Sequence, residues 1–165
     1  MMFRNIIAAL PFVAGVLSAP LESRAVSDFS IYAYGPNVHG LKVISINSTI
    51  YLTSRTPGDI TNGHNATFNA PETRGNFTAN IDGQGESVMY VPSDSGPVGF
   101  TNDTSDSSLV TSGFGFYGHV IYVQIGSEMK TKWYAVPTSD ETLYQLTWNE
   151  ESNGTPVALR NIEPS

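Results

Sequence analysis

Hydrophobic and polar residues alternate along this chain in short runs, which is the pattern of half-buried strands. The runs are rich in aromatic and β-branched residues, and clusters of Gly, Pro, Asn and Asp separate them. No amphipathic helix of useful length is visible. The pattern predicts strands over residues 29–34, 41–46, 49–53, 88–92, 119–125, 130–136, 142–148 and 156–162. We therefore predict a single all-β domain, an antiparallel β-sandwich or barrel with long loops.

Two pairs of these runs predict hairpins. The runs 41–46 and 49–53 flank Asn47-Ser48, and the runs 119–125 and 130–136 flank Gly126-Ser127-Glu128.

Alternation within the later runs predicts which side chains form the core. Trp133 shares a face with Thr131 and Ala135, opposite the lysines of the same run, so we expect it to point inward. We expect Tyr144, Leu146 and Trp148 to lie together as core anchors. The segment 55–85 is rich in Gly, Asn, Thr and Pro and predicts long loops with one or two strands, anchored by Phe68, Phe77 and Ile81.

The first residues predict export from the cell. Arg4 precedes an apolar run at 6–17, and small residues follow it, so residues 1–18 have the order of a secretory signal peptide. Pro11 and Gly15 interrupt the run, which is shorter than the roughly 20 residues of a membrane-spanning helix. Residues 19–25 are either a short pro-segment, trimmed after Arg24, or a disordered start. The mature β domain is then 26–165.

Charge and cysteine content narrow the function classes. The chain has 8 basic and 15 acidic residues and a formal charge of −7. Because removal of 1–18 takes away only Arg4, the mature domain is more acidic by one charge. Such a domain lacks the basic patch of a nucleic-acid or anionic-membrane binder. With no cysteine, disulfides, thiolate metal sites and cysteine catalysis are excluded. The segment 159–165 is polar and lacks the hydrophobic tail of a lipid-anchor signal.

N-glycosylation is the modification that the sequence predicts. Five Asn-x-Ser/Thr sequons occur in the mature region, none with proline at the middle position, and each predicts a surface position. Their asparagines are Asn47, Asn65, Asn76, Asn102 and Asn153.

Two sequence patterns suggest a cofactor or a metal site, but neither has the context or spacing that such a site requires. Residues 113–118 match G-x-G-x-x-G, but a strand pattern follows them where a dinucleotide site requires a helix. We predict instead a Gly-rich strand that turns at Gly118. His39, His64 and His119 form no short-spaced ligand pair, so we predict neither a cofactor nor a metal site.

Acidic loop residues leave a hydrolase open as the alternative function. Glycoside hydrolysis uses two carboxyl groups roughly 5 to 9.5 Å apart. Asp59, Glu72, Asp82 and Glu86 fall in the loop-rich region where such a site could form. The alternative assigns catalysis to Glu72, Asp82 or Glu86.

Aromatic residues give the favoured hypothesis, because planar rings can stack on the apolar faces of sugars. We expect the ligand-binding residues to be Tyr32, Tyr34, Tyr51, Tyr117 and Tyr122. The opposing interpretation is that most of these rings are half-buried sheet residues.

Five runs along the chain resemble a group of small, mostly uncharacterised secreted proteins of filamentous fungi. They are FSIYAYG at 29–35, TSGFGFYG at 111–118, WYAVP at 133–137, LTWN at 146–149 and PVALR at 156–160. The resemblance implies an extracellular or cell-wall protein and carries no catalytic residue. We thus expect a secreted glycoprotein without catalytic activity, associated with the cell wall or interacting with a host. Its expected partner is a cell-wall polysaccharide or a host protein.

Overall fold

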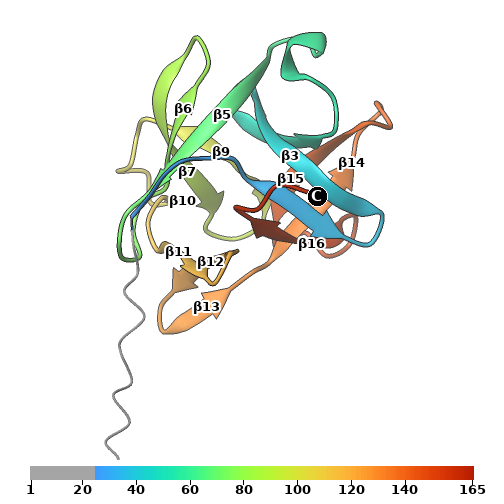
Figure 1. Cartoon of the computed structure of the whole chain (residues 1–165). Helices are drawn as coiled ribbons and strands as arrows, with labels where there is room; N and C mark the ends of the chain where they lie inside the picture. Colours follow the sequence, from blue (N-terminus) through green and yellow to red (C-terminus); the bar gives the residue numbers. More distant parts are fainter. Residues whose placement is uncertain (1–24) are drawn as a thin grey trace, which may run out of the picture.

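The computed structural model describes residues 25–165 (Figure 1). The predicted signal peptide, 1–18, lies outside the described residues, as does the 19–25 segment apart from Ala25. Within 25–165 there is no α-helix, and no helix there is long and apolar enough to cross a membrane. One short 3-10 helix, η1 (Pro57–Asp59), accompanies 16 strands. The strands are β1 (Val26–Phe29), β2 (Tyr32–Gly35), β3 (Val38–Ile46), β4 (Thr49–Thr53), β5 (Gly63–Ala70), β6 (Thr78–Ile81), β7 (Gly85–Pro92), β8 (Gly96–Pro97), β9 (Gly99–Thr101), β10 (Leu109–Val110), β11 (Phe114–Tyr117), β12 (Val120–Ile125), β13 (Glu128–Lys130), β14 (Trp133–Pro137), β15 (Leu143–Trp148) and β16 (Thr155–Arg160).

Ten of the strands close into an antiparallel barrel. Successive neighbours are β3, β5, β6, β7, β9, β4, β15, β14, β16 and β2, and β2 pairs again with β3. β3 also pairs directly with β4, from Lys42 opposite Thr53 to Ile46 opposite Thr49. The β3–β4 hairpin therefore divides the circuit into two halves and belongs to both. One half runs through β5, β6, β7 and β9, and the other through β15, β14, β16 and β2. The prediction of an all-β barrel or sandwich is confirmed, and the architecture is a barrel with extra strands outside it.

The β3–β4 hairpin forms where the sequence predicts it. Its two turn residues, Asn47 and Ser48, have φ angles of +49° and +62°. A turn with two positive φ angles matches the right-handed twist of the flanking strands.

Two other predicted strands are divided in the structure. The run 29–34 splits into β1, which pairs with β5, and β2, which pairs with β3 and β16. The run 130–136 splits at Thr131 and Lys132, so that β13 pairs with β12 while β14 pairs with β15 and β16. The predicted hairpin at Gly126 is confirmed, but its second strand is only three residues long. The chain leaves β13 and brings Trp133 into the core instead.

The core contains the anchors that the alternation predicts. Trp133 and Trp148 are buried, and their ring centroids lie 4.8 Å apart. Phe68, Phe77 and Ile81 are buried as well, and the segment 55–85 contains β5 and β6. Leu146 and Ala135 are buried, whereas Tyr144 is half-buried and Thr131 is exposed.

One core hydroxyl is unusual. Ser45 of β3 is fully buried, and its Oγ has no hydrogen-bond partner among the described residues. A buried polar group without a partner reduces stability.

Candidate functional site

Four of the five predicted tyrosines lie on one outward surface. Tyr117 pairs with Val120, Val120 with Arg160, and Arg160 with Tyr32. Directly paired residues share a sheet face, and so do residues two apart in a strand. We use the name tyrosine face for the outer surface of β11, β12, β16 and β2, which contains Tyr32, Tyr34, Tyr117, Tyr122 and Arg160.

The accessible part of the tyrosine face extends from β11 to Tyr34. Tyr117 is 76% exposed, the most exposed large hydrophobic residue in the described chain. Tyr122 is half-buried because it packs across Gly115, where an added Cβ would lie 2.7 Å from the tyrosine oxygen. Arg160 is exposed, and its guanidinium carbon lies 5.5 Å from the ring centroid of the half-buried Tyr34. The surface therefore combines aromatic rings with one cation.

The far end of this face is covered by the last residues of the chain. Tyr32 is only 9% exposed, and this burial, together with the nearby Glu163 carboxylate, raises the pKa of its phenol. Tyr34 Oη donates to the carbonyl oxygen of Ile162 over 2.8 Å. Pro164 lies against Gly40, with no space for a side chain between them. Tyr32 thus contributes to packing rather than to the accessible surface.

Tyr51 lies apart from the other four, in a pocket on the outside of the barrel. The pocket has a volume of about 420 Å³ and lies between the β3–β4 hairpin, the β4–β5 connection and the β14–β15 turn. Its apolar lining consists of the half-buried Tyr51, Ile46, Ile60 and Leu143. Its polar lining residues are Arg55, Asp59, Thr61, Thr138, Ser139 and Asp140. We call this cavity the Arg55 pocket.

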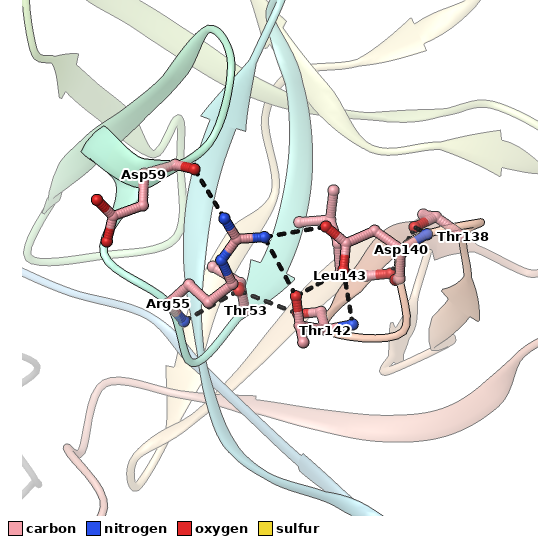
Figure 2. Close-up of polar contacts among 7 residues, drawn as sticks. All are labelled: Thr53, Arg55, Asp59, Thr138, Asp140, Thr142 and Leu143. Carbon is pink, nitrogen blue, oxygen red and sulfur yellow. Dashed lines mark hydrogen bonds and ion pairs between the residues drawn. The ribbon is translucent and has the colours of Figure 1, made fainter.

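Arg55 joins the two loops that border the pocket (Figure 2). Its Nη1 lies 3.0 Å from Asp140 Oδ2, and its Nη2 donates to the main-chain oxygen of Asp59 over 2.7 Å. The carboxylate of Asp59 points away from this guanidinium. A planar donor group therefore ties the β4–β5 connection to the β14–β15 turn.

The β14–β15 turn holds Asp140 in a fixed orientation. Asp140 Oδ1 accepts hydrogen bonds from the Thr142 hydroxyl at 2.6 Å and from the Thr142 N–H at 2.9 Å. These two donors, with a smaller contribution from Arg55, lower the pKa of the Asp140 carboxyl below its ordinary value. Asp140 is therefore a stable anion and hydrogen-bond acceptor at neutral pH.

The three acids of the hydrolase alternative are all exposed, and Glu72 lies apart from the other two. Asp82 N donates to the carbonyl oxygen of Asn65, while Glu72 follows Ala70 at the other end of β5. The five residue-to-residue steps from Asn65 to Ala70 span about 16 Å in an extended strand. Glu72 is thus separated from the β6–β7 hairpin, where Asp82 lies in the turn and Glu86 lies near the start of β7.

The predicted glycosylation sites differ in their surroundings. Asn47, Asn76, Asn102 and Asn153 are exposed. Asn65 is half-buried in β5, where its Oδ1 accepts from Lys42 Nζ at 3.0 Å and its Nδ2 donates to Asp82 at 3.2 Å. The amide nitrogen that would receive a glycan is therefore already engaged in a hydrogen bond.

The predicted strand with a turn at Gly118 is confirmed, since β11 and β12 pair across Gly118, whose φ is +60°. In residues 25–165, no three His, Cys, Asp or Glu side chains lie close enough to hold a metal ion. His119 instead bonds to Asn161 over 3.0 Å.

Sequence reasoning missed the Arg55–Asp140 pair. The two residues are 85 positions apart and become neighbours only through the pairing of β4 with β15. The only local signal was the Asp140-x-Thr142 spacing, which favours an Asp side chain that bonds to the backbone two residues on.

No family model matches the chain, and neither the curated proteins nor the solved structures contain a match.

Proposed function

We propose that this chain is a secreted, cell-wall-associated glycoprotein that binds polysaccharide through the tyrosine face and has no catalytic activity. The observation that carries the proposal is the common outward direction of Tyr34, Tyr117 and Tyr122 beside Arg160. Phenol rings offer apolar faces to sugar C–H groups, and their hydroxyls tolerate water. Secretion, glycosylation and the fungal resemblance rest on the sequence.

Three features of the tyrosine face suit an extended ligand. It continues over four strands, so that one polymer could contact several rings. Because Gly115 has no side chain, the Tyr122 ring lies across it, on the same strand that carries Tyr117. Arg160 adds a cation that can donate hydrogen bonds to sugar hydroxyls.

The test is co-sedimentation of the mature protein with insoluble chitin, β-1,3-glucan and fungal cell wall. Tyr117→Ala should weaken retention roughly threefold to tenfold, the range expected for loss of one aromatic contact. Tyr117→Phe is the matched control, because it keeps the ring and should retain binding. Both variants should unfold at the wild-type temperature, since Tyr117 is 76% exposed.

The same experiment separates the competing functions. Sugar released into the supernatant would identify a hydrolase and overturn the non-catalytic proposal. Absence of retention on all three materials would also overturn it and would direct the search to a host protein.

A further inference from the structure

The Arg55 pocket has the size and composition of a small-ligand site. Its volume of about 420 Å³ falls within the range of roughly 300–1,000 Å³ that is usual for such sites. Its lining combines four apolar residues with six polar ones, among them the fixed Arg55–Asp140 pair. This cavity is separate from the tyrosine face. Its lining residues come from β3, β4, β15 and the connections next to these strands, and none of them lies on β11, β12, β16 or β2.

The aromatic ring in this pocket is held in place. Tyr51 is half-buried between its strand neighbours Ile44 and Gln145, and Gln145 Nε2 donates to Tyr51 Oη at 3.3 Å. A ring fixed in this way presents a surface to the C–H groups of a ligand without ordering a mobile side chain.

The ion pair offers an unused donor beside an unused acceptor. A guanidinium has five N–H groups, and Arg55 uses Nη1 and Nη2 in contacts with Asp140, Thr142 and Asp59. These three contacts leave two N–H groups free for a ligand. Asp140 Oδ2, 3.0 Å from Nη1, keeps a lone pair, because Thr142 occupies only Oδ1. Adjacent hydroxyls on a sugar ring can use both groups, one accepting from Arg55 and the other donating to Asp140.

Charge in the pocket selects against anions. The Arg55 charge is already compensated by Asp140, and Asp59, whose carboxylate points away from the guanidinium, is a second acidic residue of the lining. An entering carboxylate or phosphate would meet a net negative environment. A neutral ligand meets no such penalty.

We infer that the Arg55 pocket is a binding site for one neutral pyranose unit, which stacks on Tyr51 and places a vicinal diol against the Arg55–Asp140 pair. This inference rests on the geometry of the pocket and does not require that the tyrosine face bind polysaccharide.

The test is a titration of the ¹⁵N-labelled mature protein, followed by amide NMR shifts. The neutral probes are the methyl glycosides of glucose, mannose and galactose, methyl glucuronide is the anionic probe, and glucosamine is the cationic probe. At least one neutral probe should shift amides of residues 54–62 and 138–143 in a saturable manner. Methyl glucuronide should bind at least about tenfold more weakly than that neutral probe.

Asp140→Asn and Arg55→Met should each reduce the affinity about tenfold or more, because each removes a charged hydrogen-bonding partner of the diol. Lys132→Met is the matched control for loss of an exposed cation, since Lys132 bonds to Asn149 at the other end of β14, and it should leave the titration unchanged. Thermal unfolding verifies that each variant is folded. If Arg55→Met fails to fold, two measurements remain decisive. They are the affinity of Asp140→Asn and the ratio of the wild-type affinities for the neutral and the anionic probe.

Three results would overturn the inference. They are no saturable shift at the pocket with any neutral probe, binding of methyl glucuronide as tight as that of the best neutral probe, and preferential binding of glucosamine. Retention of the Arg55→Met variant on insoluble polysaccharide is measured separately and reports on the tyrosine face. It therefore distinguishes a failure of the pocket to bind a sugar unit from a failure of the tyrosine face to bind polysaccharide.

Discussion

The indole N–H of Trp133 donates a buried hydrogen bond of 3.1 Å to the main-chain oxygen of Ile121. Trp133 belongs to β14 of the closed barrel, whereas Ile121 belongs to β12, outside the ten-strand circuit. The backbone pairing between β12 and the barrel is a single residue pair, Val120 with Arg160. The β11–β13 sheet, which carries Tyr117 and Tyr122, is also held by two backbone hydrogen bonds between Phe114 and Gly75 and by packing of Phe116 on Phe29 and Phe77. The Trp133 side chain adds a buried attachment from β14 to β12.

Trp133→Phe should destabilise the fold by about 1–3 kcal/mol. The change leaves the Ile121 carbonyl without its partner and opens space beside Trp148. Chemical unfolding measures the loss. Amide hydrogen exchange of β12 measures the attachment and should become faster in Trp133→Phe. Trp148→Phe, which leaves the Trp133 hydrogen bond intact, is the control and should not increase the exchange rate of the β12 amides. An unchanged exchange rate in Trp133→Phe would contradict the proposed attachment.

Glycan occupancy should differ between the five sequons. Asn47, Asn76, Asn102 and Asn153 are exposed and can carry a glycan without structural change. A glycan on Asn65 Nδ2 would crowd the hydrogen bonds that Asn65 makes with Lys42 and Asp82. Glycopeptide mass spectrometry of the secreted protein should find Asn65 the least occupied of the five. Full occupancy at Asn65, with β5 intact, would contradict this reasoning.

Stability should fall in acid because of three similar turns. Asp103, Asp106 and Asp140 each accept hydrogen bonds from the Ser or Thr two residues on, and in each case these bonds lower the pKa of the carboxyl. A carboxyl whose pKa is lower in the folded state stabilises the protein above its unfolded pKa of about 3.9. That contribution disappears as the pH falls from about 4 through the lower folded-state pKa values.

The measurement is urea unfolding between pH 7 and pH 2. Replacement of all three acids by Asn, which still accepts the turn hydrogen bonds, should flatten the pH dependence below about pH 4. Identical pH profiles for the wild type and the triple variant would assign acid sensitivity to other groups.

Ser45→Ala should raise stability by about 1 kcal/mol, because it removes a buried hydroxyl without a partner in the described chain. Thr53→Val is the opposing control. Thr53 is equally buried, but its Oγ1 donates to the Thr142 carbonyl at 3.0 Å, so its loss should destabilise. Thermal unfolding of both variants gives the comparison. A destabilised Ser45→Ala variant would indicate that the hydroxyl has an internal water as partner.

The sequence predicts those parts of the fold that local chemistry determines. The Asn47-Ser48 hairpin is such a part, and so is the inward direction of Trp133, because a turn and the two-residue alternation require no distant partner. The division of the run 29–34 was not predictable in this way. It depends on Phe29 pairing with Phe68 and on Tyr32 pairing with Arg160, which are strand partners far along the chain.

The same distinction applies to the candidate sites. Alternation indicates which tyrosines point outward but not which of them meet, and only the pairing of β12 with β16 brings Tyr117 and Tyr34 onto one surface. Burial of Tyr32 and the separate position of Tyr51 likewise follow from the tertiary arrangement. The Arg55 pocket forms between segments that give no shared signal in the sequence.

Because the β3–β4 hairpin closes both halves of the barrel, neither half has a boundary of its own. Opening either half requires the loss of pairing along β3 or β4, and this removes a wall from the other half. The molecule should accordingly melt as one cooperative unit, although it contains no disulfide. A proteolytic fragment that keeps only β5–β7 or only β14–β16 would lack β3 and β4 and could not form a closed barrel.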